Sequence, residues 1–96
     1  MPVGVLQLEI LLPEAASLKD RRQVVQSLKA QLRHRFNVSV AEMDETHDLW
    51  QRATIGIAAI GPDGNYLLGL LQQAGAAAET ILAGQRVTWS AAELIA

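Results

Sequence analysis

The stretch "LEILLPEAASLKDRRQVV" (residues 8–25) decides the fold, because two hydrophobic periods meet in it. In residues 3–12 apolar side chains recur at every second position, which indicates a strand with one buried face. Pro13 then ends the strand, since proline cannot donate a hydrogen bond to a neighbouring strand. Ser17 is a good helix N-cap, and Asp20 suits the positive end of the helix dipole. The stretch therefore predicts a strand followed closely by a helix.

The predicted helix, from Leu18 to about Phe36, has one apolar side and one basic side. The apolar side repeats with a period of 3.6 and consists of Leu18, Val25, Leu28 and Leu32. The opposite side carries the candidate nucleic-acid-binding residues Lys19, Arg22, Lys29 and Arg33. Arg21 lies in phase with the apolar residues. We therefore expect it either to extend past the end of the sheet or to pair with an acid there.

The rest of the chain predicts three more strands and one more helix. The strands are expected in residues 37–43, 49–61 and 85–94, and the helix in residues 66–83, with Gly84 as its stop. The order β-α-β-β-α-β favours a ferredoxin-like α+β plait, with a four-stranded antiparallel sheet and both helices on one face. The first and third strands should be central. The last strand fits neither parity, so the side that Trp89 faces is left open.

Composition places limits on the kind of protein. The 96 residues suffice for one domain with a single core, and we take residues 1–96 as that domain. Cysteine is absent, which fits the cytoplasm, and the N-terminus resembles neither a signal peptide nor a membrane span. The net charge is −2, yet six of the eight Lys and Arg residues lie between Lys19 and Arg35. This asymmetry is a hint about partners.

Two surfaces are candidates for binding. The basic helix side could contact a phosphate backbone, which needs only charge and reach, or it could be a solvated face. The sheet face without helices should carry Val5, Gln7, Glu9, Ser39, Trp50, Arg52 and Thr54. There Trp50, near Arg52, could stack on a base or make a cation–π contact across the sheet. Alternatively, Trp50 could cover the end of the sheet or be buried against another subunit. We expect a homo-oligomer, most simply a dimer.

An enzymatic or metal-binding role finds little support. The connection containing Glu42, Asp44, Glu45, His47 and Asp48 could attract a cation, but its spacing matches no metal-binding template, and a solvated loop is the simpler interpretation. There is no glycine-rich phosphate loop, and "GPDG" (residues 61–64) is typical of a turn. We therefore expect no catalytic residues, no metal and no cofactor.

Three segments, "SLKDRRQVVQSL", "RFNVSVAE" and "DLWQRATIGIA", resemble the YlxP-like family, a small bacterial family of unknown function. The resemblance runs from about residue 3 to residue 60. It rests on Ser17, Leu18, Lys19, Arg22, Phe36, Asn37, Val38, Ser39, Glu42, Trp50, Gln51 and Arg52. It implies the same ferredoxin-like fold and carries over no catalytic residue. Family genes often lie near translation and ribosome-maturation genes, which implies a role connected with RNA or the ribosome.

These observations together suggest a function. We expect a non-enzymatic accessory protein that associates with RNA or the ribosome through the basic helix. The alternative is a homo-oligomeric interaction or regulatory module that uses the open sheet face, or a sensor of a small ligand there.

Overall fold

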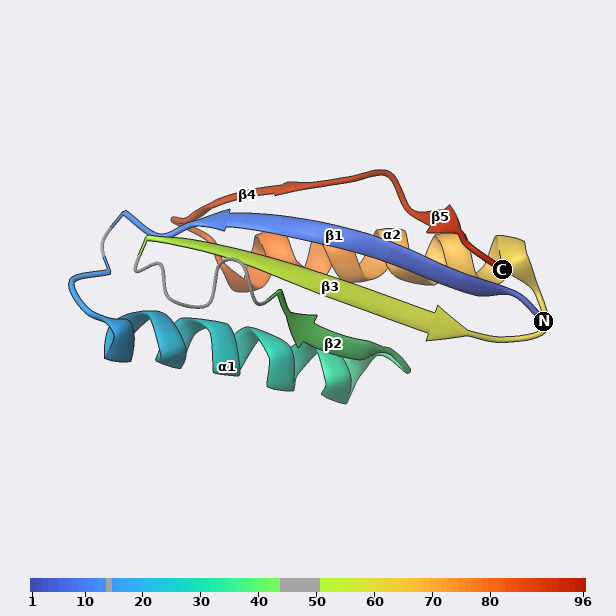
Figure 1. The fold of residues 1–96 in the computed structure, drawn as a ribbon, viewed down its shortest axis with the longest axis horizontal. Helices are drawn as coiled ribbons and strands as arrows, with labels where there is room; N and C mark the ends of the chain where they lie inside the picture. The colour runs from blue at the N-terminus through green and yellow to red at the C-terminus, as the bar shows by residue number, and fades with distance from the viewer. Residues whose placement is uncertain (14, 44–50) are drawn as a thin grey trace.

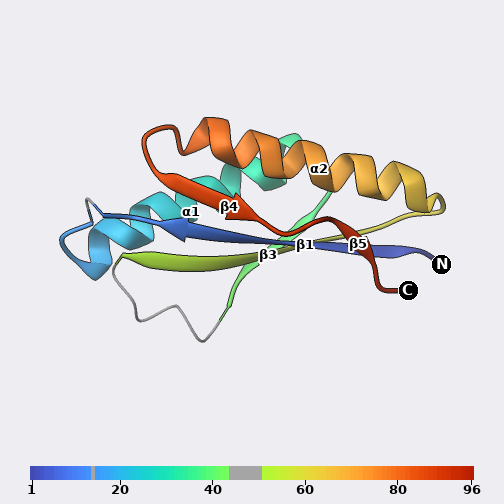
Figure 2. The ribbon, with the colours of Figure 1, turned by 90° about the horizontal axis from the view of Figure 1, so that it is seen from above.

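Two helices lie on one face of an antiparallel sheet, as the views in Figures 1 and 2 show. The computed structural model describes residues 1–13, 15–43 and 51–96. The elements in chain order are β1 (Val3–Leu11), α1 (Leu18–Arg35), β2 (Ser39–Glu42), β3 (Arg52–Ile60), α2 (Gly64–Ile81), β4 (Arg86–Trp89) and β5 (Glu93–Leu94). The predicted ferredoxin-like plait is confirmed.

Strand β1 is the centre of the sheet. It pairs with β3 over its full length, from Val3 opposite Ile60 to Leu11 opposite Arg52, and with β4 on its other side. The strand order is β2-β3-β1-β4, so the first and third strands are central as predicted. The alternating residues Leu6, Leu8 and Ile10 are buried against the helices. The other face of the sheet, called here the open face, carries no helix (Figure 2).

Helix α1 begins and ends where its capping residues predict. The Ser17 hydroxyl accepts a hydrogen bond from the backbone N–H of Asp20 at 3.2 Å, and the Asp20 carboxylate accepts one from Ala16 at 3.1 Å. At the other end, the N–H of Phe36 bonds to the carbonyl of Leu32. The apolar side buries Val25, Leu28 and Leu32. Helix α2 begins two residues before the predicted position, because the Asp63 side chain caps it by accepting from Asn65.

The C-terminal segment forms two short strands in place of the single predicted strand. Both β4 and β5 pair with β1, and Ser90 lies in the break between them. Its hydroxyl accepts the N–H of Gln7 at 3.0 Å, and its own N–H donates to the Gln7 carbonyl at 2.9 Å. A side chain thus takes the place of a backbone acceptor, and the ladder is interrupted. This interruption explains why one strand parity did not fit the whole segment.

Trp89 faces the helices. It lies opposite the buried Leu8 on β1, and its indole N–H donates to the Glu79 carboxylate on α2. Gly75 makes room for the ring, because a Cβ atom built there would lie 2.8 Å from the nearest ring carbons. The orientation that the sequence left open is therefore determined by a close contact between α2 and β4.

Substitution of the two α2 glycines tests this contact. Gly75→Ala should lower the free energy of unfolding by about 1–3 kcal/mol, since the new methyl group must displace the rigid indole ring. Gly69→Ala is the matched control. Nothing lies within 4 Å of its Cβ position, so alanine should stabilise the helix by about 0.5–1 kcal/mol. Urea unfolding of both variants measures the difference, and an equal gain in stability would mean that Trp89 does not pack on Gly75.

Candidate functional site

The exposed side of α1 presents the predicted cations to solvent. Lys19, Arg22 and Arg33 are exposed and Lys29 is half-buried. Lys19, Arg22 and Lys29 make no ion pair with any residue in the described part of the chain. Lys19 and Arg33 are fourteen residues apart, which is about 21 Å along a helix. Because Lys19, Arg22 and Lys29 form no such ion pair, their charges are not neutralised by acids in the described ranges.

Arg33 differs from the other three cations. Its guanidinium donates to the backbone carbonyl of Val40 at 3.0 Å. Val40 belongs to β2, the edge strand, whose unpaired carbonyls would otherwise face solvent. Arg33 thus covers part of a sheet edge, and less of its hydrogen-bonding capacity is left for a ligand.

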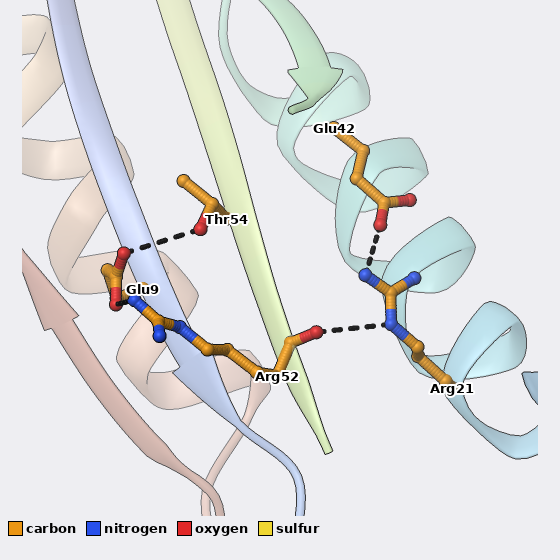
Figure 3. Close-up of polar contacts among 5 residues, drawn as sticks. All are labelled: Glu9, Arg21, Glu42, Arg52 and Thr54. Atoms are coloured by element: carbon orange, nitrogen blue, oxygen red, sulfur yellow. Dashed lines mark hydrogen bonds and ion pairs between the residues drawn. The ribbon is translucent and has the colours of Figure 1, made fainter. Parts of the chain in front are cut away.

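Arg21 is buried, and the acid expected to pair with it is Glu42 at the end of β2. The two form an ion pair, and the Nε of Arg21 also donates to the backbone carbonyl of Arg52 at 3.2 Å (Figure 3). The Arg21 side chain is 2% exposed and that of Glu42 is 19% exposed. A buried guanidinium needs such partners, because an unpaired charge away from water is costly. Glu42 is therefore engaged in the fold, which argues against its role as a cation ligand.

The open face brings together six of the residues predicted for it, Ser39 among them. By register, Glu9 lies opposite Thr54, Gln7 lies two positions along β1, and Val5 two further. The guanidinium of Arg52 pairs with Glu9 at 2.7 Å, and the Thr54 hydroxyl donates to the other Glu9 oxygen at 3.3 Å (Figure 3). The Arg52 side chain is therefore bound to an acid of the same sheet. Trp50, Asp44, Glu45, His47 and Asp48 lie outside the described residues.

A hollow of about 570 Å³ on the open face was missed by sequence reasoning. It lies where small residues occupy open-face positions of β2 and β3, namely Ala41, Gly56 and Ala58. Met43 forms a wall, with its sulfur 3.4 Å from the Cβ position of Gly56. The polar residues of its rim are Gln7, Ser39, Ser90 and Glu93. The run of small residues at alternate positions was the signal in the sequence.

Two further observations concern metals and membranes. Among residues 1–13, 15–43 and 51–96, no three histidine, aspartate or glutamate side chains gather into a group that could hold a metal ion. Neither helix of this part of the chain is long and apolar enough to span a membrane.

Comparison with known proteins bears on the family. Residues 3–91 match the family described as "Protein of unknown function (DUF503)". Over 58 residues the chain is 36% identical to the uncharacterized protein YlxP of Bacillus subtilis (strain 168). That alignment covers 60% of this chain and 62% of the relative, which is less than two thirds of either. The similarity supports the resemblance seen in the sequence and brings no described activity.

The buried ion pair can be tested by removing Arg21 alone and then both partners together. Arg21→Met should lower the free energy of unfolding by about 3 kcal/mol, because Glu42 loses its cation and the Arg52 carbonyl loses a donor. The double variant Arg21→Met/Glu42→Leu should recover part of that loss. Arg22→Met, at the adjacent exposed arginine, should change stability by less than about 0.5 kcal/mol. Urea unfolding measures all three, and similar effects at positions 21 and 22 would contradict the buried pair.

Proposed function

Because the chain belongs to the DUF503 family, whose function is unknown, we propose a role from its own surfaces. The proposed role is that of a non-enzymatic accessory protein of the cytoplasm that associates with RNA or the ribosome through α1. The observation that carries the proposal is that Lys19, Arg22 and Lys29 have no acidic partner in the described part of the chain. The gene context implied by the family resemblance supports the same role.

The chemistry of this side of α1 favours contact with a phosphate backbone over contact with bases. The exposed row contains cations and Gln26 but no aromatic side chain on which a base could stack. Contacts between cations and phosphates release counterions, so they make affinity strongly dependent on salt and give little sequence preference. The proposed partner is thus a structured RNA recognised by its charge and shape.

Charge reversal tests the surface. Arg22→Glu/Lys29→Glu should weaken binding to a structured RNA at least tenfold at about 50 mM salt. It should also reduce the slope of log K against log salt by about 0.7–0.9 for each phosphate that the protein no longer neutralises. Fluorescence anisotropy over a salt series gives both quantities.

The control compares two single variants that change the charge equally at different places. Arg86→Glu alters an exposed arginine on β4 and should leave affinity close to that of the unmodified protein, whereas Arg22→Glu alone should weaken it. Absence of RNA binding at about 50 mM salt, or an equal decrease in affinity in both single variants, would contradict the proposal.

A second candidate function is a homo-oligomeric interaction module that uses the open face. The observation in its favour is the exposure of large apolar side chains there, with Ile60 55% exposed and Leu11 40% exposed. Both lie on open-face positions of the central strands β1 and β3. Self-association would remove this apolar surface from water.

Light scattering tests the second candidate. If the open face is the interface, the protein should be a dimer at high concentration, and Ile60→Lys should shift it toward monomer because a charge would be buried. Tyr66→Lys is the control, since Tyr66 is 64% exposed but lies on α2. A monomer at every concentration, or equal effects of the two substitutions, would count against an interface on this face.

A further inference from the structure

The open-face hollow is formed by two adjacent rows of residues across the sheet. One row runs Ser39, Ala58, Val5 and Glu93 over four strands, a width of about 14 Å at ~4.8 Å per strand spacing. The next row runs Ala41, Gly56, Gln7 and Ser90. Glycine has no side chain and alanine has only a methyl group, so the floor of the hollow is low in the middle. The floor is therefore flat and apolar, and the polar side chains lie around it.

The polar rim of the hollow has unused hydrogen-bonding capacity. Within the described residues, the side chains of Gln7, Ser39 and Glu93 make no hydrogen bond or ion pair. The Ser90 oxygen accepts from the Gln7 backbone, so its own hydrogen can still be donated. A hollow of about 570 Å³ with a few polar groups around an apolar floor has the size and character of a small-ligand site.

The charge of the rim selects among ligands. Glu93 is the one charged residue among those that line the hollow in the described part of the chain, and no lysine or arginine lines it. A phosphate would meet a carboxylate and no cation. A carboxylate instead accepts two parallel N–H bonds, the geometry by which it binds a donor pair on a flat edge. Met43 at the wall offers a sulfur that packs well against an aromatic ring.

We propose that the open-face hollow binds a planar heterocycle without phosphate whose edge carries two adjacent N–H donors, as the guanine base does. Glu93 accepts both donors, and Gln7, Ser39 and Ser90 bond to the exocyclic carbonyl oxygen and the remaining ring nitrogens. The ring lies on the floor over Gly56 with Met43 beside it. This site does not rest on the proposed RNA contact, because α1 lies on the other face of the sheet (Figure 2).

Guanosine is the probe for this proposal. Titration followed by calorimetry and by backbone amide NMR shifts should give saturable binding with a Kd below about 1 mM, with the shifts confined to the open face. Inosine lacks the exocyclic amino group and should bind about tenfold more weakly, which corresponds to about 1.4 kcal/mol. Guanosine 5′-monophosphate should bind no more tightly than guanosine, because no lysine or arginine among the described lining residues could pair with its phosphate.

Variants of the full chain test the binding site while leaving the fold intact. Glu93→Gln keeps the shape of an exposed side chain and should weaken guanosine binding about tenfold. Gly56→Ala adds a methyl group at an ordinary 3.4 Å contact with Met43, so the chain should fold while the raised floor reduces affinity. Lys29→Glu on α1 should leave guanosine binding unchanged and is the control.

Several results would overturn the proposal. One is the absence of saturable binding at about 1 mM guanosine. Others are equal affinity for guanosine and inosine, unchanged affinity in Glu93→Gln, or the same decrease in Lys29→Glu. Open-face NMR shifts that follow protein concentration without any ligand would show instead that a second copy of the chain occupies the hollow. Because the RNA test uses α1 variants and this test uses open-face variants, either proposal can fail alone.

Discussion

The buried guanidinium of Arg21 is the constraint on which much of the arrangement depends. A charge removed from water at the end of the sheet must keep its partners, or the cost of burial is not offset. Its partners are the Glu42 carboxylate at the end of β2 and the Arg52 carbonyl at the start of β3. One side chain from the first turns of α1 therefore holds two strands at one end of the sheet. The position of the helix and the start of β3 are set together.

Arg52 extends this constraint to the open face. Its carbonyl is held by Arg21 on the helix side, while its own guanidinium pairs with Glu9 on the other side (Figure 3). Glu9 also accepts from Thr54, so the charges at this end of the open face are largely satisfied. Glu93, near the opposite end, has no such partner in the described residues. The two ends of the same face are thus chemically different.

The two proposed binding surfaces lie on opposite sides of the molecule and differ in character. The outer side of α1 is a row of cations without aromatic residues, which suits a charged polymer. The open face has an apolar floor and, among the described residues, a single carboxylate at its hollow, which suits a small neutral ring with donors. Strand alternation keeps the surfaces apart, because successive side chains of β1 point to opposite faces. The two surfaces therefore share no side chain.

Periodicity and capping were enough to predict the order of elements, the start of α1 at Ser17 and the open-face parity of Val5, Gln7, Glu9, Arg52 and Thr54. These features depend on residues close together in the chain, whose local geometry is nearly independent of the rest. The pairing of Arg52 with Glu9, the bond from Arg33 to Val40, the ladder break at Ser90 and the hollow over Gly56 were decided only by the folded chain. Three of these features bring together residues that are far apart in the sequence. The fourth is the contact of Arg33 on α1 with the edge strand β2. Such contacts follow from register and close packing, which a local pattern does not specify.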